Sequence, residues 1–130
     1  MATTFEEVKD IFRSMPQTRF NIPDALEDQW LKTAVADYEL NIGCELPYDE
    51  VTKEFTTKIP MVVQTTLGRM MYVSYLTREL SRVMALNGIY GKDVQLTGQD
   101  ATKRVTKQEL DDQIALVERL LHRQKEPAYG

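Results

Sequence analysis

The stretch from Pro60 to Leu86 constrains the fold more than any other part of the sequence, because it predicts one long, uninterrupted helix. Proline is tolerated in the first turn of a helix, and Gly88 is well placed as the stop at the other end. At about 100° per residue, two apolar rows lie side by side on this helix. The core stripe contains Val62, Thr66, Val73, Leu76, Thr77, Leu80 and Met84, and the second row contains Val63, Leu67, Met71 and Tyr75.

The two rows together are wider than one packing partner covers. A helix that is apolar over most of its circumference is normally buried. In one interpretation the chain's other helices surround it. In the other, the second row packs against another chain, which would make Leu67, Met71 and Tyr75 subunit-interface residues.

Three shorter helices are predicted around this one. Thr4 and Glu7 have the spacing of a capping box, which starts a helix that ends near Ser14, before Pro16. A second helix begins near Pro23 and stops before Gly43. Its predicted inner face is formed by Leu26, Trp30, Ala34 and Tyr38.

The last helix is predicted to begin at Thr106, because Thr106 and Glu109 form a second capping box. Its inner stripe contains Leu110, Ile114, Val117 and Leu121. The glycine-rich segment Gly88–Asp100 reads as a loop with a brief extended piece at Val94–Leu96. The segment "VTKEFTTKIP" is either a short helical turn or an extended lead-in, because the residue before Pro60 is pushed away from helix.

These elements predict an all-α fold: a small helical bundle of about four helices around one long central helix, with an extended loop and a C-terminal tail. A length of 130 residues suits one helical domain over 1–130. The core would span about 4–125, and 126–130 would form the tail.

Charge and cysteine content narrow the function classes. The 16 basic and 20 acidic residues give a net charge of -4, whereas a dedicated nucleic-acid binder carries a strong basic excess. The lone cysteine, Cys44, forms no internal disulfide and is expected to be a small loop residue. No apolar run reaches the roughly 18 residues of a membrane span. The acidic N-terminus is unlike a signal peptide, so we expect a reducing, cytoplasmic compartment.

The sequence offers no recognisable catalytic, cofactor or metal site. Its single histidine, His122, is expected on an exposed helix end rather than in a pocket. There is no Cys/His cluster with zinc spacing, and "LNGIYGKD" lacks the Ser or Thr that follows Lys in a phosphate-binding loop. We therefore expect a binding or structural protein rather than an enzyme.

Two arginines on the long helix call for acidic partners. Arg78 and Arg82 are four residues apart, and a like-charge pair at this spacing is unfavourable by roughly 0.2–0.5 kcal/mol. We hypothesise that they meet acids of a neighbouring chain. The candidates are Asp49 and Glu50, or Glu27 and Asp28. The alternative is that acids of the same chain, or Glu79 and solvent, suffice.

The pattern of the chain resembles the small helical head–tail connector, or neck adaptor, proteins of tailed bacteriophages. The resemblance covers about residues 4–125. It is carried by the opening helix "TTFEEVKDIF", the aromatic spine of Trp30 and Tyr38, the lead-in around Phe55, the long helix with "LGRMMYVSYLTRELSRV", the loop "GKDVQLTG" and the final helix "TKQELDDQIALVERLL".

The resemblance implies a structural virion protein, made in the host cytoplasm and placed in the neck of the virion. Such adaptors form a ring beneath the portal, with the portal's twelvefold symmetry, and present a surface to the next neck or tail-completion protein. Genomic DNA passes through the channel without sequence-specific binding, and no membrane is involved. By analogy, Lys92, Gln95 and Tyr129 are candidate contacts to the portal or neck.

Two other readings stay open. A small cytoplasmic helical regulator that binds a protein partner would share the helical fold and the lack of catalytic groups. A DNA-binding helical domain would use Arg69, Arg78, Arg82 and Lys103–Arg104, against the acidic balance of the chain.

Overall fold

The computed structural model describes residues 2–15, 22–90 and 97–125, with side chains described except at 82–90, 97–103 and 125. The elements in chain order are α1 (Phe5–Arg13), α2 (Asp24–Ile42), β1 (Tyr48–Asp49), β2 (Glu54–Phe55), α3 (Met61–Tyr90) and α4 (Thr97–Lys125). The prediction of a mostly helical fold is confirmed. The small β1–β2 hairpin is an addition that the sequence pattern did not predict.

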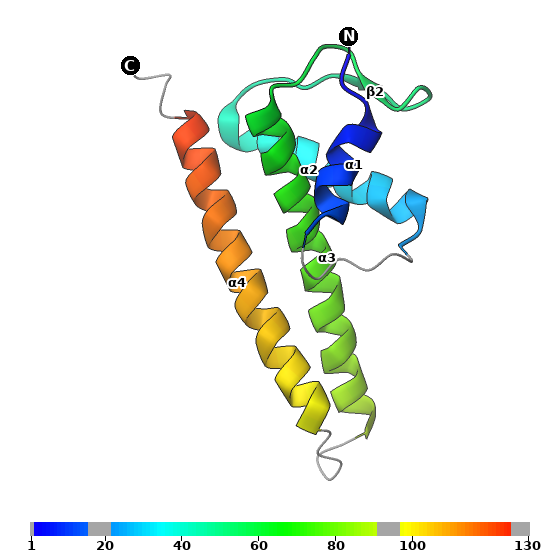
Figure 1. Cartoon of the computed structure of the whole chain (residues 1–130), viewed down its shortest axis with the longest axis vertical. Helices are drawn as coiled ribbons and strands as arrows, with labels where there is room; N and C mark the ends of the chain where they lie inside the picture. The colour runs from blue at the N-terminus through cyan, green and yellow to red at the C-terminus, as the bar shows by residue number, and fades with distance from the viewer. Residues whose placement is uncertain (1, 16–21, 91–96, 126–130) are drawn as a thin grey trace.

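The two longest helices, α3 and α4, lie side by side as an antiparallel pair (Figure 1). They have nearly equal lengths, 30 and 29 residues. α1 and α2 pack against α3 near its N-terminal half, and α2 also contacts α4 (Figure 1). The predicted single long helix therefore has a partner of its own length.

The ends of the first two helices follow the predicted capping chemistry. Thr4 Oγ1 accepts a hydrogen bond from the Glu7 N–H at 3.3 Å, and the Glu7 carboxylate accepts one from the Thr4 N–H at 2.8 Å. α2 starts directly after Pro23 and ends at Gly43, whose φ of 80° is left-handed. Glycine favours that region because it has no Cβ to clash. Both predictions are confirmed.

The boundaries predicted between α3 and α4 are wrong. α3 continues past Gly88 to Tyr90, and α4 begins at Thr97 instead of Thr106. Thr106 lies inside α4 and is buried, so its hydroxyl is not at a helix start. Capping satisfies only the free N–H groups of a first turn, and the same spacing carries no such signal within a helix. Of the predicted loop, 91–96 lie outside the described residues, as does the tail 126–130.

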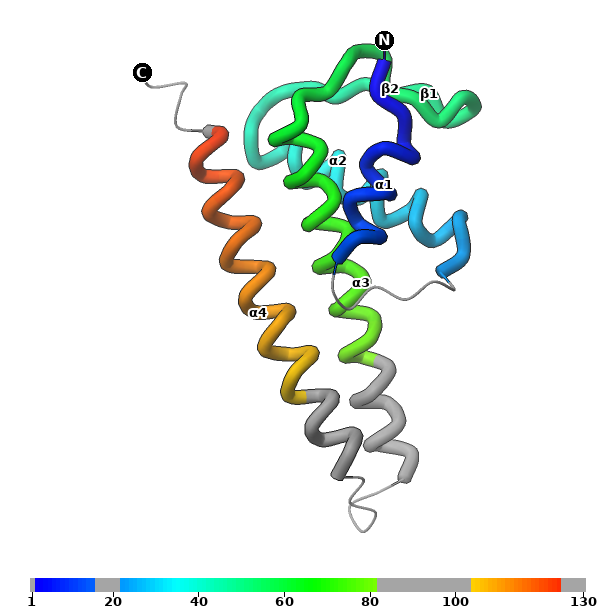
Figure 2. The backbone as a smooth tube through the Cα atoms, in the orientation of Figure 1, coloured from blue at the N-terminus to red at the C-terminus, as the bar shows by residue number. Residues whose placement is uncertain are grey.

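The ambiguous segment before Pro60 is extended. β2 pairs antiparallel with β1, with Tyr48 opposite Phe55 and Asp49 opposite Glu54. The N-terminal segment runs beside β2 (Figure 2), where the Phe55 N–H donates to the Thr3 carbonyl at 2.8 Å. These bonds satisfy backbone groups that would otherwise be unpaired at a sheet edge. They also hold the start of α1 against the hairpin.

The core lies where α1 and α2 pack on α3. Aromatic side chains from the three helices form T-shaped, edge-to-face contacts there. The ring centres of Phe12, Trp30 and Tyr75 lie 5.8, 6.0 and 6.1 Å apart. The predicted inner face of α2 is confirmed at Trp30, Ala34 and Tyr38, all of which are buried.

The predicted core stripe of α3 is only partly correct. Val62 and Thr77 are exposed, while Thr66 and Leu76 are fully buried. The face of α3 that carries Leu67 and Met71 is covered by α1 and α2, and it is more deeply buried than the stripe we assigned. The sequence shows that α3 has two apolar rows, but it does not show which of the two rows packs against α1 and α2.

Candidate interaction surface

The residues of the second apolar row of α3 that were predicted to meet another subunit are not on the surface of the chain. Leu67 and Met71 are completely buried and Tyr75 is 2% exposed, all within the core of one chain. The prediction that these three residues meet another subunit is therefore wrong for a chain folded in this way. The alternative interpretation, in which the chain's own helices cover the row, accounts for them.

The structure places only part of the predicted charge contact. Arg78 is exposed on α3, and the side chain of Arg82 lies outside the described residues. Asp49 at the end of β1 and Glu50 in the turn that follows are both exposed. Glu50 has Lys32 at 3.3 Å, and both side chains of that pair are at least one-third exposed. Asp49 and Glu50 thus remain accessible to a partner.

Glu27 is unavailable to a neighbouring chain. It is buried, and it accepts two hydrogen bonds from Arg13, from Nε at 3.1 Å and from Nη2 at 2.7 Å. This paired geometry is among the stronger hydrogen-bonded ion pairs in proteins. The hydrogen bond to Glu27 also raises the pKa of Arg13. The prediction that Glu27 faces Arg78 or Arg82 of another subunit is wrong.

Asp28 is likewise engaged within the chain. Its carboxylate pairs with the fully buried ammonium of Lys9, and its Oδ2 lies 3.0 Å from Lys53 Nζ. Burial opposes charge on Asp28, but the hydrogen bonds from Lys9 and Lys53 outweigh it and lower its pKa. Lys9 also lies 3.6 Å from Asp24 and 3.8 Å from Glu6.

The charged cluster of Lys9, Asp28 and Lys53 joins α1, α2 and the β1–β2 hairpin. Its role is to hold the three elements together, because a buried lysine is stable only with opposite charges around it. Sequence reasoning assigned Asp28 to an interface and did not single out Lys9. The i+4 spacing of Lys9 from the buried Phe5 was the available signal.

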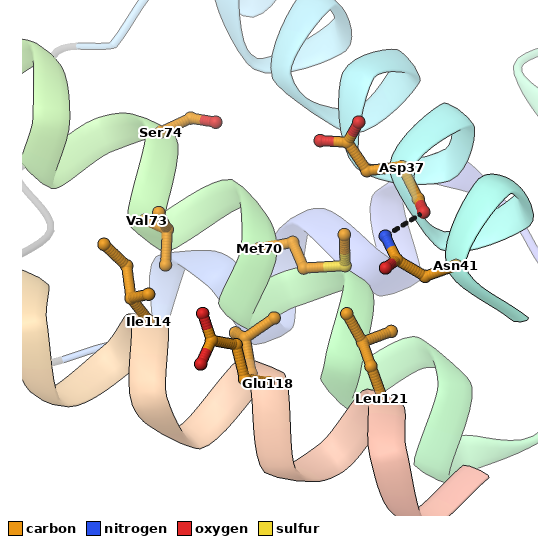
Figure 3. A pocket seen from close by; sticks show the side chains of 9 residues that line it. Asp37, Asn41, Met70, Val73, Ser74, Ile114, Glu118 and Leu121 are labelled. Atoms are coloured by element: carbon orange, nitrogen blue, oxygen red, sulfur yellow. Dashed lines mark hydrogen bonds between the residues drawn. The ribbon is translucent and has the colours of Figure 1, made fainter. Parts of the chain in front are cut away.

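An open groove lies where α2, α3 and α4 meet (Figure 3). Its volume is about 230 Å³. The floor is apolar and comes from α3 and α4, and polar side chains from all three helices stand around it (Figure 3). The lining residues are Asp37, Asn41, Met70, Val73, Ser74, Ile114, Val117, Glu118 and Leu121.

Two carboxylates give the groove its charge. Asp37 on α2 and Glu118 on α4 are both exposed and stand on either side of Met70 (Figure 3). Within the described part of the chain, neither forms an ion pair. A cavity of about 150 Å³ is enough to hold benzene, so the groove has room for a large side chain. A long side chain with an apolar stem and a cationic end suits it best.

The groove was not found from the sequence. Asp37 and Glu118 are each flanked by apolar positions on their own helices, which is ordinary for amphipathic helices. Only the contact between α2 and α4 brings the two carboxylates to one site. No pattern within either helix predicts that contact.

Other predicted positions are exposed or outside the description. His122 is exposed on α4, as expected, and Cys44 is an exposed free cysteine. Lys92, Gln95 and Tyr129 lie outside the described residues. Among the residues that are described, no group of three His, Cys, Asp or Glu side chains could hold a metal ion. The described helices include none long and apolar enough to cross a bilayer.

Comparisons with known proteins found no similarity. No protein-family model matches the sequence, and no curated protein or solved structure matches it.

Proposed function

We propose that this chain is a head–tail connector of a tailed bacteriophage, a structural protein that forms a ring beneath the portal and continues the DNA channel. The observation that carries the proposal is the pair of long helices, α3 and α4. At 1.5 Å per residue, each is about 45 Å long. An elongated helical subunit suits a ring, because its long sides can repeat around a central channel.

The finer arrangement also belongs to this proposal. α3 would be the central helix of each subunit, with α1, α2 and α4 packed around it. Arg78 and Arg82 would face Asp49 and Glu50 of the next subunit. Contacts of this kind contribute mainly to specificity and register. Lys92, Gln95 and Tyr129 would contact the portal or the next neck or tail-completion protein.

The charge of the chain is compatible with a channel for DNA. Affinity for DNA grows with each lysine or arginine that contacts a phosphate. A net charge of -4 limits such contacts, so genomic DNA would pass without being held. In this proposal the protein is made in the host cytoplasm and functions in the virion neck, without a membrane partner.

The test is the mass of the purified protein in solution, alone and mixed with a candidate portal protein. We expect a small species at micromolar concentration that adds to the portal ring in a number matching the ring's symmetry. A stable monomer or dimer that ignores every portal tried would contradict the connector and favour the regulator.

The second candidate is a small cytoplasmic helical regulator of a protein partner. The groove between α2, α3 and α4 favours it, since an open apolar floor with two carboxylates can accept one basic side chain of another protein. The same mass measurement separates the two, because a regulator has no reason to recognise a portal ring.

A further inference from the structure

We draw no further inference here: the strongest candidate, the open groove between α2, α3 and α4, identifies no partner, because Glu118 shares a surface hollow with Arg119, His122 and Arg123 of its own helix and nothing in the structure shows what covers the groove.

Discussion

Gly68 is the position where α3 and α1 come closest, and its replacement by alanine tests how these helices pack. A Cβ at residue 68 would lie 2.7 Å from Ile11 Cγ2, 3.1 Å from Ile11 Cβ and 3.4 Å from the Phe12 backbone nitrogen. The Cγ2 methyl is fixed close to the backbone of α1. The overlap therefore cannot be relieved by moving the end of a flexible side chain.

Two opposing effects set the size of the change for Gly68→Ala. Alanine in a helix interior is favoured over glycine by about 1 kcal/mol. Forcing an extra methyl into a packed contact typically costs about 1–3 kcal/mol. The net expectation is a destabilisation of about 1 kcal/mol, which lowers the melting temperature by roughly 3–5 °C in a domain of this size.

Urea unfolding followed by the fluorescence of Trp30 measures this free energy. In the Ile11→Ala background, which removes Cγ2, Gly68→Ala should cost clearly less. The matched control is Ile11→Val, which keeps both γ carbons and should give no relief. A Gly68→Ala variant that is more stable than the wild type by about 1 kcal/mol would refute the packing, because only the helix preference would then remain.

Two further predictions concern a helix end and the charge cluster. Gly43→Ala should lower the free energy of unfolding by about 1 kcal/mol, because an alanine with φ of 80° is strained. No atom lies within 4 Å of the added Cβ, so a steric clash does not contribute. Urea unfolding measures this free energy, and an unchanged midpoint would contradict the left-handed conformation at the end of α2. Asp28→Asn should cost about 3 kcal/mol near neutral pH by leaving Lys9 buried without its closest anion. Because the pKa of Asp28 is lowered below its ordinary value of 3.8, its stabilisation is present above pH 3.8 and is lost as the pH falls through the lower folded value, so the two proteins should converge only well below pH 3.8. A difference that does not depend on pH would contradict the ion pair.

Local signals predicted the parts of the fold that depend on local chemistry. The capping box at Thr4 and the stop at Gly43 are properties of a few neighbouring residues, and both helix ends lie where the sequence placed them. The second capping box at Thr106 failed because the same spacing occurs inside a helix that has already started. Gly88 failed for a related reason, since one glycine costs only about 1 kcal/mol in a helix supported by packing.

The sequence did not predict which helices pack against one another. Leu67, Met71 and Tyr75 read equally well as a core face or as a subunit contact, and the choice depends on where α1 and α2 pack. The partners of the acidic residues also depend on how the helices pack. Glu27 and Asp28 looked like exposed helix residues, but the crossing of α1 over α2 brings Arg13 and Lys9 to them.

The groove depends on three helices at once, so no single segment carries its signature. Asp37 and Glu118 are 81 positions apart in the chain (118 minus 37) and meet only through the contact of α2 with α4. Tyr38 and Gln124 are joined by a hydrogen bond near the same contact, and Gln124 Nε2 donates to Thr66 Oγ1 at 2.8 Å. These bonds fix the position of α4 beside α2 and α3.

Electron cryomicroscopy of the protein mixed with a candidate portal tests the central claim most directly. The account predicts a closed ring of this chain, coaxial with the portal and open at its centre. Portal rings that carry no added density, or isolated copies bound without contact to one another, would contradict it.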